Sequence, residues 1–325
     1  MLLEDLVDAY GAHRRLSGLS AETLRVEASV LRGFVGSVGN MPVRRIGPAD
    51  LDRWLGDHRL AASTRQSQVS RVRQMFAWAV VMRIIPTDPT VAVRSVRIPR
   101  RDHARLPAAR FAELLRATTE PRARLACALG LYGMLRVSEI RSIRWDDVDL
   151  VADTLHVTVH KTDDVDELPI CLELHNEFVA YKSWYVRALG SPDGALPLLP
   201  SRRVVPSGPV QWRRDEPWCN VNHAVKRALA DIGVAGMGVG THTLRRSGAR
   251  GWFDALRDDG HDGAIQRVRA MLHHSSSSMT ERYLGLSEER AQRDRLLRGA
   301  PMFAGSQLAV VRTVGDIRGG DDGRL

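Results

Sequence analysis

The chain has 325 residues and carries 47 lysines and arginines against 38 acidic residues; this net charge of +9 favours a polyanionic partner such as DNA or RNA. It has no apolar run of about 20 residues, no secretory leader and only three isolated cysteines, which excludes a membrane-spanning or disulfide-rich protein and indicates a cytoplasmic one. The absence of paired cysteines, of a His-Glu-x-x-His motif and of a Gly-rich phosphate loop predicts no metal, no nucleotide and no other cofactor.

Residues 1–98 are predicted to form a helical domain, because apolar residues recur in them at helical spacing. Ser20 is a suitable N-cap, and Pro48 stands at the start of a helix, where proline is favoured. The expected helices run from Leu2 to Leu16, from Ser20 to about Val38, from Gly47-Pro48 onward, and from Ser63 or Thr64 to before Pro86.

Basic residues are concentrated in the last of these helices and in a linker expected at residues 99–107, where Pro99 and Pro107 break regular structure. A basic tether suits a chain that crosses a DNA backbone. A solvated linker, or an arginine bias that follows genomic base composition, is the alternative. The candidate DNA contacts are Arg65, Arg71, Arg73, Arg97, Arg100 and Arg101.

Residues 108–300 are predicted to form a mixed α/β domain, followed by a tail of residues 301–325. Two alternating strands between residues 155 and 170, joined by a turn rich in aspartate, predict a small β-sheet. Residues 190–219 are rich in proline and give no clear pattern, and residues 257–263 are expected to form a lengthened loop. Helices are expected at residues 108–118, 122–134, 138–143, 172–187, 221–231, 243–256, 264–272, 278–284 and 287–298.

Three short boxes in this second domain hold side chains suited to phosphoryl transfer. Arginines can clamp phosphate oxygens with paired donors, histidines can move or hold protons near neutral pH, and a tyrosine can form a covalent intermediate. The boxes are Gly133-x-x-Arg136-x-Ser138-Glu139, His242-x-x-Arg245, and Leu272-x-His274-Ser275-Ser276 with Tyr283 nine residues after His274.

In order and spacing, these boxes resemble those of the tyrosine recombinases, the phage integrase family, in a two-domain form without an arm-binding domain. The resemblance implies that Tyr283 is the nucleophile and that Arg136 and Arg245 hold the phosphoryl oxygens. It further implies that His274 adds a hydrogen bond to the phosphate and that His242 is an acid/base partner.

The resemblance also points to a lysine and contains one departure. The family places a lysine on a β-hairpin between the first arginine and the His-x-x-Arg box; this position matches Lys161, one of only three lysines in the chain. A lysine can release its proton and an arginine cannot, so Lys161 is expected to protonate the leaving 5′ oxygen. Glu139 is expected to support Arg136. His273 stands where the family usually has glycine, which permits a backbone conformation that other residues resist.

The fold implied by the resemblance is mainly α with a small β-sheet: an N-terminal helical, SAM-like core-binding domain followed by a mixed α/β catalytic domain. The implied reaction cleaves and rejoins DNA through a 3′-phosphotyrosyl intermediate. The implied partners are double-stranded DNA attachment sites, three further copies of the chain in a homotetramer, and an accessory directionality protein, with no membrane involved. The tail at residues 301–325 is expected to dock on a neighbouring protomer.

Three functions remain open on this chemistry. The first is an integrase of a phage or other mobile element, which the departure at His273 and the divergent residues 190–219 and 257–263 favour. The second is a cellular recombinase that resolves chromosome or plasmid dimers. The third is a non-catalytic DNA-binding regulator on the same fold, against which the complete set of catalytic residues argues.

Overall fold

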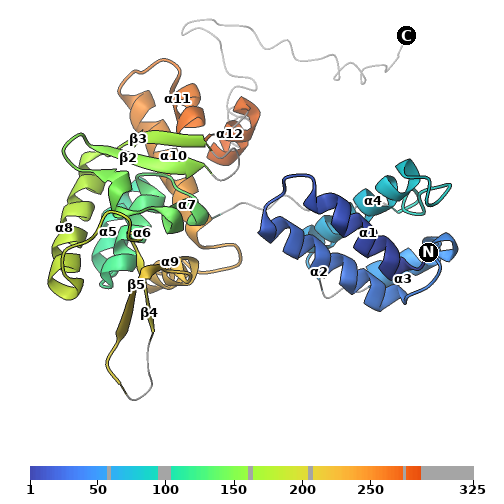
Figure 1. Cartoon of the computed structure of the whole chain (residues 1–325). Helices are drawn as coiled ribbons and strands as arrows, with labels where there is room; N and C mark the ends of the chain where they lie inside the picture. Colours follow the sequence, from blue (N-terminus) through green and yellow to red (C-terminus); the bar gives the residue numbers. More distant parts are fainter. Residues whose placement is uncertain (57–59, 94–103, 160–163, 204–207, 274–275, 287–325) are drawn as a thin grey trace, which may run out of the picture. The chain divides into compact units, whose positions relative to one another are not determined.

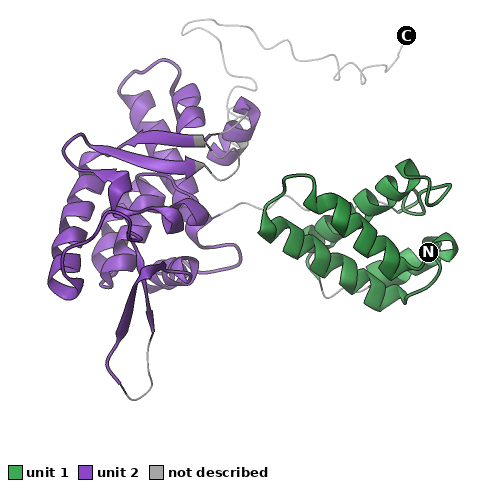
Figure 2. Cartoon of the chain, viewed as in Figure 1, with its two compact units in different colours: residues 1–102 green, residues 103–325 purple. Residues whose placement is uncertain are grey.

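Figure 1 presents the computed structural model, which describes the chain except for residues 57–59, 94–103, 160–163, 204–207, 274–275 and 287–325. The chain divides into two compact units, residues 1–102 and residues 103–325 (Figure 2). The boundary falls within residues 99–107, which the sequence assigns to a linker. Within the described residues, no helix has the length and apolar character needed to cross a membrane.

The first unit consists of helices that each bury one apolar face. Leu6, Phe34, Leu51 and Phe76, one from each main helix, meet in its core. The Ser20 hydroxyl accepts a hydrogen bond from a backbone amide in the first turn of the second helix, so it is an N-cap. The elements are α1 (Leu3–Arg15), α2 (Ala21–Val38), the 3₁₀ turn η1 (Val43–Arg45), α3 (Pro48–Leu55) and α4 (Ala62–Val81).

The second unit is organised around α6 (Pro121–Leu131), which is buried along most of its length. Helix α10 (Thr241–Asp258) packs against it. A Cβ atom at Gly248 would fall 1.8 Å from the Leu131 carbonyl oxygen, so this close approach requires glycine. The other helices are η2 (Ala108–Arg110), α5 (Phe111–Ala117), α7 (Val137–Ser142), η3 (Trp145–Asp147), α8 (Leu172–Leu189), α9 (Val221–Asp231), α11 (Ala264–Met271) and α12 (Ser277–Leu284).

Several expected boundaries in the second unit are wrong. Helix α6 ends at Leu131 rather than near residue 134, because the chain turns there and Met134 adopts a positive φ of 50°. Helix α10 starts two residues earlier than expected and runs to Asp258, so the lengthened loop predicted at residues 257–263 is shorter. The helix expected at residues 287–298 lies outside the described residues.

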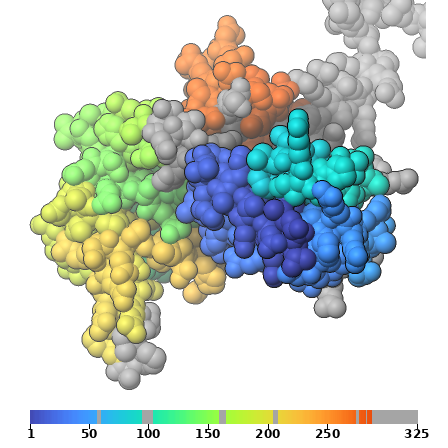
Figure 3. Space-filling model, turned by 45° about the vertical axis from the view of Figure 1, so that its right-hand side comes forward, coloured from blue at the N-terminus to red at the C-terminus, as the bar shows by residue number. Residues whose placement is uncertain are grey.

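Two small antiparallel sheets complete the unit. The first has the order β1–β2–β3, from β1 (Val148–Asp149), β2 (Thr154–Val159) and β3 (Asp164–Pro169). Its β2–β3 hairpin matches the predicted one, whereas β1 was not predicted. The second, formed by β4 (Pro200–Arg203) and β5 (Gln211–Pro217), was not predicted and lies in the stretch without a clear pattern. This β4–β5 hairpin stands out from the rest of its unit in the ribbon and space-filling views (Figure 1 and Figure 3).

A buried arginine anchors the β4–β5 hairpin. The Arg122 side chain is 1% exposed, and its guanidinium carbon lies 4.8 Å and 4.3 Å from the ring centroids of Trp212 and Trp218. Arg122 also donates to the Pro200 carbonyl at 2.8 Å and pairs with Glu120 at 2.7 Å. Cation–π stacking and two charge-assisted bonds therefore join the base of the hairpin to α6.

Candidate active site

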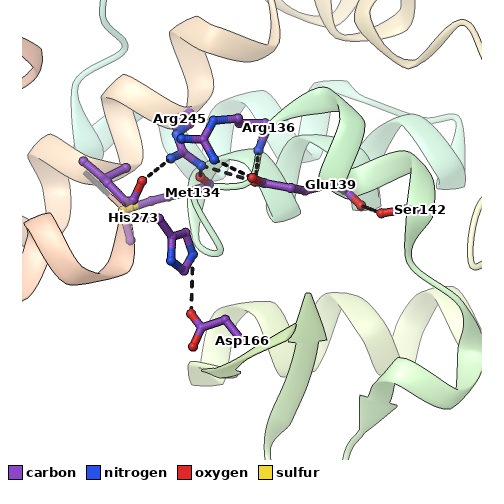
Figure 4. Close-up of polar contacts among 8 residues, drawn as sticks. Met134, Arg136, Glu139, Ser142, Asp166, Arg245 and His273 are labelled. Carbon is purple, nitrogen blue, oxygen red and sulfur yellow. Dashed lines mark hydrogen bonds and ion pairs between the residues drawn. The ribbon is translucent and has the colours of Figure 1, made fainter. Parts of the chain in front are cut away.

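Two arginines from distant boxes converge on Glu139 (Figure 4). Arg136 is the residue before α7, and its Nη1 atom lies 2.6 Å from Glu139 Oε1. The Arg136 backbone amide donates to Oε2 at 2.6 Å, and Arg245 Nη1 lies 3.4 Å from the same oxygen. The Glu139 side chain is only 2% exposed, and a buried carboxylate is costly unless it is paired. Glu139 therefore fixes both guanidinium groups relative to each other.

Arg245 joins three segments of the second unit. It lies in α10, is 2% exposed, and donates to the carbonyl oxygens of Met134 and Leu272, the latter at 2.7 Å. These carbonyls belong to the α6–α7 loop and to the turn after α11. Burial lowers the pKa of Arg245, but a guanidinium stays charged in proteins. The arrangement presents a fixed positive charge of the kind that binds a phosphate diester.

Tyr283 lies in α12, which packs on α10 and α11. Its ring belongs to a cluster with Met134 and Leu272 and is half-buried. Burial raises the pKa of the Tyr283 hydroxyl, while the positive charges of Arg245 and Arg246 act in the opposite direction. The hydroxyl is therefore protonated at neutral pH and must transfer its proton before the oxygen can attack.

His242 stands in the first turn of α10, where its side chain reaches solvent. Partial burial of the ring and the neighbouring Arg245, Arg246 and Arg136 lower the pKa of His242, and Glu139 opposes them only in part. The imidazole is therefore neutral at neutral pH and able to accept a proton. The charges of Arg245 and Arg136 thus act on both His242 and Tyr283.

Sequence reasoning missed Arg246, which neighbours the selected Arg245. Arg246 is 9% exposed, and its charge acts on Tyr283. Its Nε atom is buried and has no hydrogen-bond partner among the described residues. A buried donor without a partner is uncommon in a folded protein and calls for an explanation. No signal in the sequence separates Arg246 from an ordinary basic residue on a helix.

Two of the six residues predicted to be catalytic, Lys161 and His274, lie outside the described residues. The strands before and after Lys161 are paired up to Val159 and Asp164. His273, directly before His274, has a positive φ of 51°, the left-handed conformation that favours glycine. Within the described part of the chain, no group of three or more His, Cys, Asp or Glu side chains could hold a metal ion.

Of the arginines predicted to contact DNA, two donate to carbonyl oxygens of the first unit, and three lie outside the described residues. Arg71 Nη1 donates to the Ser67 carbonyl, one turn earlier on α4, at 3.1 Å, and Arg73 donates to the Val93 carbonyl. Arg65 is partly buried. The others, all undescribed, are Arg97, Arg100 and Arg101.

Curated relatives are tyrosine recombinases. The chain is 28% identical over 155 residues to tyrosine recombinase XerC of Xanthomonas campestris pv. campestris (strain B100), a match that covers 44% of this chain and 48% of the relative. It is 27% identical over 306 residues to tyrosine recombinase XerC of Neisseria meningitidis serogroup C, covering 88% and 92% of the two chains. The chain thus spans about half the length of the first relative and most of the second.

Solved structures share the fold at low identity. A lambda integrase dimer bound to a COC′ core site has a TM-score of 0.68 at 19% identity, covering 87% of this chain and 77% of that chain. A Tn1549 transposon integrase in complex with a circular intermediate DNA has a TM-score of 0.64 at 15% identity, covering 91% and 99%. These likenesses confirm the predicted fold class. The curated relatives of the chain carry the name tyrosine recombinase. The phage integrase family model matches residues 105–290, which is more than half of the chain, and the chain therefore belongs to the phage integrase family.

Proposed function

We propose that this chain is a site-specific DNA recombinase, an integrase that cleaves and rejoins DNA through a 3′-phosphotyrosyl intermediate. The observation that carries the proposal is the Arg136–Glu139–Arg245 group beside the Tyr283 hydroxyl, in a chain of the phage integrase family. Buried charge of this kind is costly to maintain, and its placement next to a tyrosine suits a phosphate bound for attack.

In the proposed reaction, the Tyr283 oxygen attacks the phosphorus and its proton passes to the neutral His242 imidazole. The bond from phosphorus to the 5′ oxygen breaks, and Lys161 protonates that oxygen as it leaves. Arg136 and Arg245 hold the non-bridging oxygens, on which charge develops. His274 donates a further hydrogen bond to them. The phosphotyrosyl bond conserves the energy of the broken linkage, so a 5′ hydroxyl from another strand can reverse the step.

The proposed substrate is double-stranded DNA with paired, inverted core half-sites, and the proposed assembly is a homotetramer on that DNA. A net charge of +9 supports a polyanionic partner. A related solved structure is a lambda integrase tetramer bound to a Holliday junction. An accessory directionality protein and a tail of residues 301–325 that docks on a neighbouring protomer belong to the same proposal.

Within this class we propose the integration or excision of a phage or other mobile element. The second candidate is a cellular recombinase that resolves chromosome or plasmid dimers, because the curated relatives carry the name XerC. Sequencing the DNA junctions that the protein forms in cells distinguishes the two. Junctions between element and chromosome support the first, whereas junctions between two copies of one chromosomal site support the second.

A nicked suicide substrate tests the proposed chemistry, because loss of the short 5′ strand traps the covalent intermediate. We expect the native chain to become attached to the DNA 3′ end and Tyr283→Phe to bind the same duplex without attachment. Tyr132→Phe is the matched control, a half-buried tyrosine of the same unit whose pKa burial also raises. A covalent complex formed by Tyr283→Phe would show that another residue is the nucleophile. Binding without any trapping by the native chain would favour a non-catalytic regulator.

A further inference from the structure

His273 occupies a backbone position that suits glycine. Its φ of 51° lies in the left-handed region, which residues with a side chain adopt uncommonly, although histidine does so more often than most. Such a conformation persists only where the surrounding structure holds it. The side chain at this position is therefore expected to make a contact that offsets the strain.

That contact is with the β2–β3 hairpin. His273 Nε2 lies 3.4 Å from Asp166 Oδ2, and the two side chains are 20% and 41% exposed (Figure 4). Asp166 belongs to β3, the edge strand of the β1–β2–β3 sheet, and lies two residues from Asp164, where the pairing with β2 ends. Figure 4 shows the His273 ring directed from the turn after α11 towards this strand.

The backbone on the other side of His273 is joined to the arginine pair. Leu272 accepts a hydrogen bond from Arg245 Nη2 at 2.7 Å, and Arg245 in turn lies 3.4 Å from Glu139. A continuous series of contacts therefore runs from β3 through His273 and Leu272 to the two arginines. The residue that follows His273 is His274, and the segment that follows β2 contains Lys161.

We propose that His273 is a positioning residue, whose contact with Asp166 fastens the β2–β3 hairpin to the arginine pair, so that the protonation of the leaving 5′ oxygen depends on this contact. The inference rests on the proposed function, because it assigns a geometric role in that same cleavage step. A glycine would fit the backbone equally well but could not make this contact. The histidine at this position thus joins the β2–β3 hairpin to the segment that is bonded to Arg245.

The variants that test the contact are His273→Gly, Asp166→Asn and their combination. His273→Gly keeps the left-handed backbone and removes only the side chain, so it is not expected to unfold the chain. A matched control exists in the same unit: His175 Nδ1 lies 2.6 Å from Asp153 Oδ1, and Asp153 also has a positive φ, of 54°. Asp153→Asn removes a comparable pair without touching the site.

Cleavage is measured in single turnover on nicked DNA and on the same DNA with sulfur in place of the bridging 5′ oxygen. A thiolate leaves without protonation, so this substrate does not need Lys161. We expect His273→Gly and Asp166→Asn to slow cleavage of normal DNA by about 10- to 100-fold, since small displacements in a catalytic site have effects of this order. The sulfur substrate should restore most of the rate, and the double variant should be no slower than either single one.

Three outcomes would overturn the inference. In the first, His273→Gly cleaves normal DNA at the native rate, and in the second it cleaves both substrates equally slowly. The third outcome is that the losses of cleavage rate in His273→Gly and Asp166→Asn add in the double variant. Hydrogen exchange supplies a readout that does not depend on cleavage. The β3 amides should exchange faster in His273→Gly than in the native chain or in Asp153→Asn. If the native chain forms no covalent complex, the proposed function fails while faster exchange still supports the contact. Unchanged exchange overturns the contact even if cleavage occurs.

Discussion

Two surface arginines of the first unit and one buried arginine of the second unit differ in where their partners come from. In the first unit, Arg32 and Arg71 donate to carbonyl oxygens one turn earlier on their own helices, at 3.2 Å and 3.1 Å. In the second unit, Arg245 is 2% exposed and bonds to carbonyls from two loops distant in sequence. A chain rich in arginine offers many candidates for the arginines that bind phosphate in the active site. Burial together with remote partners distinguishes Arg245 from these two surface arginines.

The strongest test of this contrast is Arg245→Gln, with Arg32→Gln as the surface control. We expect Arg245→Gln to slow cleavage by about 10²–10³-fold, the usual effect of removing a donor to developing charge. It should also lower the melting temperature, because losing one partner of a buried pair costs about 3–5 kcal/mol. Arg136→Gln should separate the two effects, since Arg136 is 29% exposed. If Arg32→Gln lost as much cleavage rate at saturating DNA and as much thermal stability as Arg245→Gln, the distinction between buried and surface arginines would be wrong.

Arg246→Gln sharpens the comparison within α10. We expect a five- to tenfold slower attachment of Tyr283 to DNA, roughly the worth of one hydrogen bond of about 1 kcal/mol. The reason is that the charge of Arg246 acts on Tyr283, while its buried Nε atom has no hydrogen-bond partner in the described part of the chain. Arg257→Gln is the control, because Arg257 is an exposed arginine on the same helix that pairs with Asp254 at 3.6 Å. Equal rates in both variants would make Arg246 a packing residue only.

The dependence of the cleavage rate on pH, on its acid side, tests whether His242 accepts the proton of Tyr283. Burial and neighbouring arginines lower the pKa of His242 below its ordinary value of 6.5, so the neutral, proton-accepting form persists to more acidic pH. Cleavage by preformed complexes should therefore hold down to about pH 6.5 and fall only below it. His242→Asn should be slower throughout and lose this decline. A profile that already falls well above pH 6.5 would show that another group accepts the proton.

The smallest effects are expected when arginines of α4 are replaced, and they should appear in DNA binding rather than in cleavage. If Arg65 and Arg71 contact phosphates, each replacement by glutamine should reduce the salt dependence of duplex binding by about 0.9 in log–log slope. Cleavage of bound DNA should stay unchanged, because these residues lie outside the candidate site. Binding measured over a range of salt concentrations gives the slope. An unaltered slope would assign these arginines to a solvated face.

Local signals in the sequence were enough for the helices of the first unit, and they also selected the boxes whose catalytic role stays a prediction. Ser20 and Pro48 mark helix starts through their own chemistry, and Tyr283 is found by its distance from His274. The β4–β5 hairpin was missed because its base is held by Arg122, far away in sequence. Arg246 was missed because only the packing of α12 on α10 distinguishes it from its neighbours.

The stacking of Arg122 between Trp212 and Trp218 has a practical consequence. Indole fluorescence responds to nearby charge and to water, and Trp184 lies 5.7 Å from Trp212, in the same aromatic group. If the hairpin shifts when DNA is engaged, the emission of these rings changes with it. Tryptophan fluorescence can therefore be used to follow the hairpin, and the change in emission caused by Trp212→Phe identifies the part of the signal that comes from Trp212.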